Sequence, residues 1–121
     1  MARARSGGAV NFGDIVLVDF GTPVGSEAGF RRPGVIVLAD AFLRYRPTTV
    51  FVVPITSTPR SFPSHIPIEP DTVNGLDQTS YAQVEQMRAV SLHRCNEHRG
   101  SVGHQVGHQI LDVLAMITGM P

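Results

Sequence analysis

The apolar residues of the chain fall into short runs separated by segments rich in glycine, proline and hydroxyl side chains. Residues 14–20, 33–39 and 49–55 each hold several β-branched side chains, and such runs bounded by turn residues are typical of strands. Residues 65–69 alternate between apolar and polar positions, and residues 78–91 carry apolar side chains at intervals. The pattern predicts five or six strands, the last segment being one long bent strand or two short ones.

The segments between these runs predict loops and turns. Residues 21–32 hold three glycines and a proline and predict a long loop between the first two strands. Residues 40–47 predict a turn or a single helical turn that ends at a proline. The pair Asn74-Gly75 predicts a tight turn, and residues 93–100 are polar without periodicity, which predicts irregular structure.

Two prolines fall inside predicted strands. Pro54 and Pro67 have no backbone N–H and cannot donate to a strand ladder. Each therefore implies a sheet edge or a bulge at its position.

One long helix is predicted near the C-terminus, over residues 102–117. Five apolar side chains in this segment fall on one stripe at helical spacing, while the glutamines and Asp112 fall off it. Gly119 is placed as the C-terminal stop of the helix. The stripe consists of Val106, Ile110, Val113, Leu114 and Ile117.

The fold expected from these elements is mainly β with one C-terminal helix, an α+β arrangement in which the helix covers one face of a small curled antiparallel sheet. The length of 121 residues favours one domain. Residues 1–12 show no periodicity and are expected to form a flexible N-terminal arm, which leaves residues 13–121 as the domain. With no signal peptide or membrane span, and a single cysteine, Cys95, the protein is expected to be cytoplasmic.

The formal net charge is zero, so charge gives no general support for nucleic-acid binding. All ten basic residues are nevertheless arginine, whose planar guanidinium matches two phosphate oxygens at once. Half of them fall within thirty residues, which allows a locally basic face on a neutral chain. Solvated arginines explain the composition equally well. The five are Arg31, Arg32, Arg44, Arg46 and Arg60.

Several known types of site are excluded or disfavoured. The chain has no dinucleotide or P-loop glycine motif, and the serine of residues 25–29 stands one place too early for a nucleophile elbow. His104 and His108 have the spacing of two zinc ligands, but Gln105 stands where a metalloprotease has glutamate and no third ligand is evident. We expect no metal and no cofactor. His65 is interpreted as a surface residue at a strand end, with acid–base catalysis as the less favoured alternative.

Three segments in the same order and spacing resemble the MazF/PemK family of toxins, over most of the chain. The first runs from Gly13-Asp14-Ile15-Val16 through the loop to Phe30-Arg31-Arg32-Pro33-Gly34-Val35-Ile36-Val37. The second is residues 46–56, which end in Pro54-Ile55-Thr56. The third is Gln83-Val84-Glu85-Gln86-Met87-Arg88-Ala89-Val90. The resemblance implies a small SH3-like, CcdB-type curled antiparallel barrel.

In that family the Arg of Arg-Pro and the Thr of Ile-Thr are the catalytic pair, and this sequence matches at Arg32 and Thr56. Because a residue before proline is pushed to extended geometry, Arg32 is expected at the mouth of a strand rather than on a wandering loop. The resemblance also implies a gating or catalytic part for two loop residues and RNA contacts for four others. The former are Ser26 and Glu27, and the latter are Phe30, Arg31, Gln86 and Arg88.

The implied activity is sequence-specific, metal-independent cleavage of single-stranded RNA, in which the ribose 2′-hydroxyl attacks the phosphorus to leave a 2′,3′-cyclic phosphate and a 5′-hydroxyl. The implied partners are a second copy of the chain and a cognate antitoxin. Two alternatives remain open at this point. One is a non-catalytic toxin of the CcdB type that poisons DNA gyrase, and the other is a degenerate relative that binds RNA without cutting it.

Overall fold

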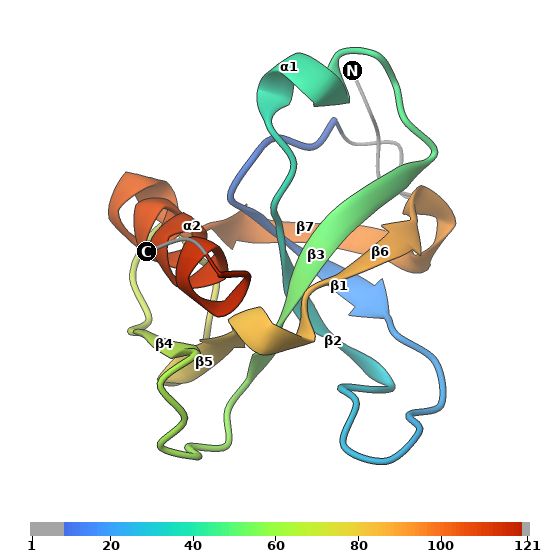
Figure 1. Cartoon of the computed structure of the whole chain (residues 1–121). Helices are drawn as coiled ribbons and strands as arrows, with labels where there is room; N and C mark the ends of the chain where they lie inside the picture. The colour runs from blue at the N-terminus through green and yellow to red at the C-terminus, as the bar shows by residue number, and fades with distance from the viewer. Residues whose placement is uncertain (1–8, 120–121) are drawn as a thin grey trace.

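The computed structural model describes residues 9–119, and its main feature is a seven-stranded antiparallel sheet. The strands follow the order β4-β5-β3-β2-β1-β7, and β6 pairs with β3 off this path (Figure 1). Because β4 and β7 stand at opposite ends of this order and do not pair, the curled sheet is not closed into a barrel. The strands are β1 (Asp14–Asp19), β2 (Arg31–Ile36), β3 (Thr49–Thr56), β4 (His65–Ile68), β5 (Ser80–Gln83), β6 (Arg88–Ser91) and β7 (Cys95–Ser101).

The described residues also form two helices and two 3-10 turns. The short helix α1 (Asp40–Leu43) precedes β3, and the 3-10 turns η1 (Val84–Gln86) and η2 (Leu92–Arg94) flank β6. The long helix α2 (Gly103–Ile117) lies across one side of the sheet beside β4 and β5 (Figure 1). The expected architecture, mainly β with one C-terminal helix, is confirmed except for the closure of the barrel.

The core has two clusters, one on each face of the sheet. Alternation along the strands divides the side chains: Ile15 contributes to the cluster under α2, and Val16 and Val18 contribute to the opposite cluster. Val35 and Ile36 of β2 are divided in the same way. Both faces are buried, and this explains the near-continuous apolar runs that the sequence shows in these strands.

The predicted helical stripe is confirmed except at its end. Ile110 is fully buried, and Val106, Val113 and Leu114 pack against the same cluster. Ile117 is 46% exposed, so it does not contribute to the core as predicted. Gly119 follows the helix with a positive φ of 103°.

Pro54 does not lie on an edge strand, because β3 pairs on both sides. On one side Pro54 faces Gly34 of β2. On the other side the pairing with β6 ends at Val52, and the pairing with β5 begins at Ile55. Pro54 thus lies opposite the gap that η1 leaves between β5 and β6. Because no described strand pairs with it on that side, its missing N–H costs no hydrogen bond of the sheet.

The prediction of irregular structure for residues 93–100 is wrong, because Cys95–Ser101 form β7. This strand pairs with β1, with two register shifts, and most of its side chains are exposed or half-buried. Since only Cys95 reaches the core, the strand shows no apolar alternation. Burial raises the pKa of the Cys95 thiol to about 11, which fits a packing residue rather than a reactive one.

The end of the expected N-terminal arm packs against the domain, whereas residues 1–8 lie outside the described part. Val10 is only 1% exposed and contributes to the core, and Phe12 packs against the cluster under α2. The Phe12 amide also donates to the Asp40 carboxylate at 2.7 Å. Within residues 9–119, no helix has the length and apolar character that a membrane span requires.

Candidate functional site

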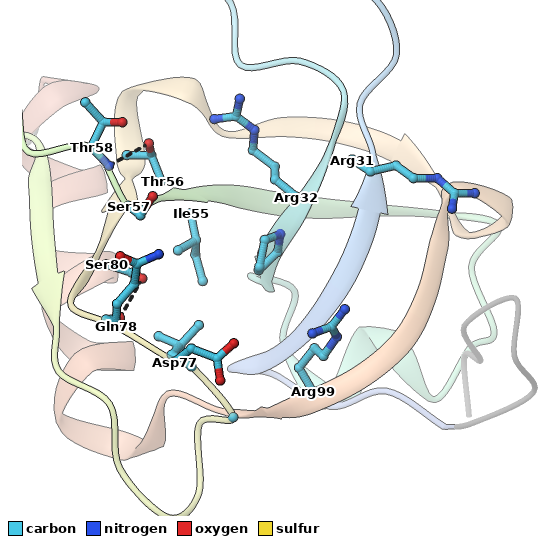
Figure 2. A pocket seen from close by; sticks show the side chains of 13 residues that line it. Arg31, Arg32, Ile55, Thr56, Ser57, Thr58, Asp77, Gln78, Ser80 and Arg99 are labelled. Atoms are coloured by element: carbon cyan, nitrogen blue, oxygen red, sulfur yellow. Dashed lines mark hydrogen bonds between the residues drawn. The ribbon is translucent and has the colours of Figure 1, made fainter.

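Arg32 and Thr56 come together at one end of the sheet. In the antiparallel pair β2–β3, Gly34 faces Pro54, and the same register extended by two residues places Arg32 opposite Thr56. Directly opposite residues of antiparallel strands project to the same face. Both side chains line a cavity of about 400 Å³, which we call the main cavity; it lies between this end of the sheet and the turn before β5 (Figure 2).

A backbone carbonyl of the β1–β2 loop holds the guanidinium of Arg32 in place. Its Nε donates to the Gly29 carbonyl at 2.9 Å, while its terminal nitrogens have no hydrogen-bond partner among the described residues. Burial, and to a lesser degree the nearby positive charge of Arg60, lowers the pKa of Arg32 from its usual value. An arginine titrates so far above neutrality that the group remains charged near pH 7. Arg32 therefore presents an oriented cation with its donor fork free.

The hydroxyl of Thr56 is oriented by the chain that follows it. The amide of Thr58 donates to the Thr56 Oγ1 at 3.2 Å (Figure 2). Because the oxygen accepts this bond, the hydroxyl proton is left to donate to a ligand in the main cavity.

Arg31 also lines the main cavity, but its side chain differs from that of Arg32 in direction. Its backbone faces Asp19 of β1, and in Figure 2 its guanidinium extends away from Thr56, whereas that of Arg32 lies on the Thr56 side. Successive residues of a strand point to opposite faces. Of the two arginines before Pro33, the geometry thus favours Arg32 as the partner of Thr56.

A second cavity, of about 170 Å³, adjoins Arg32 on the side of the β1–β2 loop, and we call it the side cavity. Ser26 and Glu27 line it together with Arg60. One carboxylate oxygen of Glu27 accepts from the Val24 amide at 2.9 Å, which folds the loop onto itself. The two loop residues singled out from the sequence therefore lie beside Arg32 but not in the main cavity.

Gln86 fastens the β1–β2 loop to the sheet. Its Oε1 accepts from the Ala28 amide at 3.1 Å, and its Nε2 donates to the Ser26 carbonyl at 3.0 Å. Each polar atom of the amide makes one of these bonds, and the second N–H of Nε2 and the second lone pair of Oε1 are left for another contact. The loop is thus positioned by a residue almost sixty positions away in the sequence.

Arg88 and Phe30 lie outside the main cavity. The Arg88 Nη1 donates to the Phe20 carbonyl at 3.2 Å, and the guanidinium lies 5.9 Å from the centre of the Phe20 ring. Phe30 has a positive φ of 61°, an uncommon conformation for a bulky residue, and its ring is 63% exposed. An exposed aromatic ring on the loop beside Arg32 suits stacking on an unpaired base.

His65 is not the surface residue that was expected. Its side chain is only 3% exposed, and Nε2 lies 2.9 Å from the Glu85 Oε2. Ser64 donates to the other oxygen of Glu85 at 2.9 Å. Partial burial raises the pKa of Glu85, but the hydrogen bonds from His65 and Ser64 outweigh it and the net shift is downward. His65 thus orients a carboxylate at the side cavity and lies outside the main cavity.

Four charged residues at these cavities were not identified from the sequence as site residues. Arg60 and Glu85 line the side cavity, and Asp77 and Arg99 line the main cavity. Of the five clustered arginines, Arg44 and Arg46 precede β3 and so lie at the opposite end of that strand from Thr56. Proximity in sequence did not distinguish them from Arg60.

Comparison with known proteins identifies the family of the chain. A family model described as PemK-like, MazF-like toxin of type II toxin–antitoxin systems matches residues 11–118. The endoribonuclease MazF of Staphylococcus saprophyticus is 37% identical over 87 residues, which cover 70% of this chain and 71% of that protein.

Solved structures share the fold at lower sequence identity. The crystal structure of MazF from Deinococcus radiodurans superimposes with a TM-score of 0.77 at 20% identity, covering 93% of this chain and 98% of that one. An endoribonuclease from a mycobacterial species, solved with its cognate antitoxin, gives 0.76 at 23% identity with the same coverage. Because the family model spans most of the sequence, the chain belongs to the PemK-like, MazF-like toxins of type II toxin–antitoxin systems.

Proposed function

We propose that the protein is a sequence-specific endoribonuclease toxin that cleaves single-stranded RNA with the ribose 2′-hydroxyl as nucleophile. The observation that carries the proposal is the main cavity, which the free fork of Arg32 and the hydroxyl of Thr56 both line. Family membership and the named activity of the staphylococcal relative support the same reaction.

In the proposed reaction, the 2′-oxygen forms a bond to the adjacent phosphorus, and the bond from phosphorus to the 5′-oxygen breaks. Negative charge accumulates on the phosphoryl oxygens, where the fork of Arg32 stabilises it and Thr56 donates a hydrogen bond. The leaving 5′-oxygen takes a proton from water, and the products are a 2′,3′-cyclic phosphate and a 5′-hydroxyl. Because the nucleophile belongs to the substrate, the reaction requires no metal-bound hydroxide.

A general base other than Arg32 is needed to accept the proton of the 2′-hydroxyl, because arginine remains protonated near neutral pH, and the carboxylates near Arg32 are candidates. Both oxygens of Glu85 are already bonded to His65 and Ser64. Glu27 lies on the loop beside Arg32 and has one of its oxygens bonded to the loop backbone. We therefore assign the proton acceptor to Glu27 rather than to Glu85, with movement of the loop carrying it toward the bound RNA. Asp77 also has a carboxylate without a partner among the described residues, but it lies at the end of the main cavity away from Arg32 and Thr56 (Figure 2).

Cleavage of a long unstructured RNA in EDTA, read out by sequencing 5′-hydroxyl ends, tests the proposed reaction. We expect Thr56→Ala to lower the single-turnover rate by roughly 10- to 100-fold, because one donor to the developing charge is lost. Thr49→Ala is the matched control, since Thr49 begins the strand that Thr56 ends and is exposed. Its rate should stay close to that of the wild type.

Absence of cleavage across a varied RNA pool would contradict the proposed reaction. Inhibition of DNA gyrase without loss of RNA would instead favour a non-catalytic toxin. Wild-type cleavage by Thr56→Ala would leave the ribonuclease assignment standing but remove Thr56 from the mechanism.

We further propose that the protein acts in the cytoplasm as a homodimer and is neutralised by an antitoxin whose acidic segment enters the main cavity. Phe42 in α1 and Tyr45 just after it are large exposed aromatic residues, and such exposed surfaces often mark protein interfaces. Light scattering should give a mass twice the 13.1 kDa of one chain. A monomer at micromolar concentration would rule out the dimer.

A further inference from the structure

The main cavity extends well beyond Arg32 and Thr56, and its far end carries a second pair of polar groups. Asp77 comes from the turn before β5, and Arg99 comes from β7 (Figure 2). The two side chains therefore reach one cavity from elements that are not neighbours in the sheet order. We call this part, formed by Leu76, Asp77 and Arg99, the distal subsite.

The distal subsite rests on a turn whose shape is determined by hydrogen bonds. Asn74 is 1% exposed, and its Oδ1 accepts from the amides of Asp71 and Leu76. Its Nδ2 donates to the Glu69 carbonyl at 2.7 Å. Since every polar atom of the Asn74 side chain is used, the backbone that presents Asp77 is held in one conformation.

Two glycines let this turn lie directly against β7. A Cβ on Gly75 would lie 2.1 Å from the Arg99 carbonyl oxygen, and a Cβ on Gly100 would lie 2.2 Å from the Val73 carbonyl oxygen. The Ser101 amide donates to the same Val73 carbonyl at 3.0 Å. This close backbone contact places Asp77 and Arg99 at the same end of the main cavity.

The distal subsite has one carboxylate and one guanidinium, which suit a ligand that carries both hydrogen-bond donors and hydrogen-bond acceptors. Among the described residues, the Asp77 carboxylate has no hydrogen bond or ion pair. Arg99 pairs with Glu97 through Nη2 at 3.3 Å, and this pair leaves the rest of its donor fork available. A carboxylate repels phosphate, so Asp77 does not serve RNA backbone binding and is suited to N–H donors of a base.

We propose that the distal subsite binds a guanine base of the RNA, in a nucleotide near the scissile phosphate. Guanine presents N1–H and N2–H together, which match the two oxygens of a carboxylate, and O6 and N7 together, which match an arginine fork. Adenine places an acceptor where the carboxylate needs a donor. The pyrimidines offer fewer matching groups, and Leu76 provides an apolar surface for the ring. This inference rests on the proposed function and specifies which base of the RNA is recognised.

Binding of 2′-O-methyl RNA octamers tests the subsite separately from cleavage, because these octamers lack the attacking hydroxyl. Wild-type protein is incubated with a pool randomised at all eight positions, and the bound octamers are sequenced. We expect guanine to be enriched at one position, and Asp77→Asn to remove the preference there only. Asp112→Asn on α2 makes the same chemical change away from the cavities and should keep it.

Modified bases in the selected octamer then assign the contacts. Inosine lacks the N2 amino group and should weaken binding to the wild type by about three- to tenfold, but not to Asp77→Asn. A 7-deazaguanine lacks the N7 acceptor and should weaken binding to the wild type but not to Arg99→Ala, which has no side-chain donor for N7. A melting temperature for each variant shows that the fold is retained.

Each outcome separates the two proposals. Guanine preference that survives in Asp77→Asn, or no octamer binding at all, would overturn the distal subsite. Cleavage of unmodified RNA with unchanged base preference in the variant would leave the ribonuclease proposal intact and remove the subsite. Guanine-dependent binding without any cleavage would keep the subsite and remove the proposed reaction.

Discussion

Replacing Arg32 with lysine is expected to lower the single-turnover rate of RNA cleavage by roughly 10²- to 10³-fold. The substitution keeps the positive charge but loses the planar fork, which contacts two phosphoryl oxygens at once. Arg32 is oriented for this contact through its Nε bond to the Gly29 carbonyl. A loss of this size is typical when one preoriented donor to a developing oxyanion is removed.

Arg44→Lys is the control for Arg32→Lys, because Arg44 lies just after α1 at the far end of β3. The Arg44→Lys variant should cleave RNA at the wild-type rate. Single-turnover cleavage by Arg32→Lys at the wild-type rate would show that charge alone is sufficient and that the bidentate contact is not made. Melting temperatures of both variants distinguish a chemical effect from a loss of fold.

Gly75→Ala is expected to destabilise the fold by roughly 3 kcal/mol or more, which corresponds to a fall in Tm of roughly 10 °C or more. Gly75 has a φ of +67°, a conformation that costs any residue with a Cβ. The new methyl group would also lie 2.1 Å from the Arg99 carbonyl oxygen, which is backbone and has no rotamer to change. Thermal unfolding followed by circular dichroism measures the effect.

Gly25→Ala separates the two causes. Gly25 has a similar φ of +59°, but a Cβ there would have no atom within 4 Å. It should therefore cost only the backbone strain, on the order of 1 kcal/mol. If both variants lost the same free energy of unfolding, the turn would not lie in close contact with β7. The distal subsite would then have no rigid support.

Much of the fold was predictable from local patterns. The β-branched runs around Val16, Val35 and Val52 place three strands, and the stripe through Ile110 places the helix, because burial repeats with the period of each element. β7 escaped prediction for the converse reason. It is held by backbone pairing to β1, and apart from Cys95 its side chains leave no apolar trace.

The candidate site was likewise predictable only in part. Arg32 and Thr56 were singled out because short motifs mark them, and Pro33 constrains the backbone next to Arg32. The occupation of Gln86 by the β1–β2 loop was not predictable, since it depends on a contact between segments about sixty residues apart. For the same reason His65 gave no sign in the sequence of its burial against Glu85.

The sequence by itself determined the strands other than β7, the long helix and the family, because side-chain periodicity and short motifs are local properties of a chain. The tertiary structure alone decided that Arg32 faces Thr56 and that Asp77 meets Arg99 in the same cavity. Strand register and the close approach of Gly75 to β7 produce these meetings. Both are long-range backbone contacts, which no single segment of the sequence encodes.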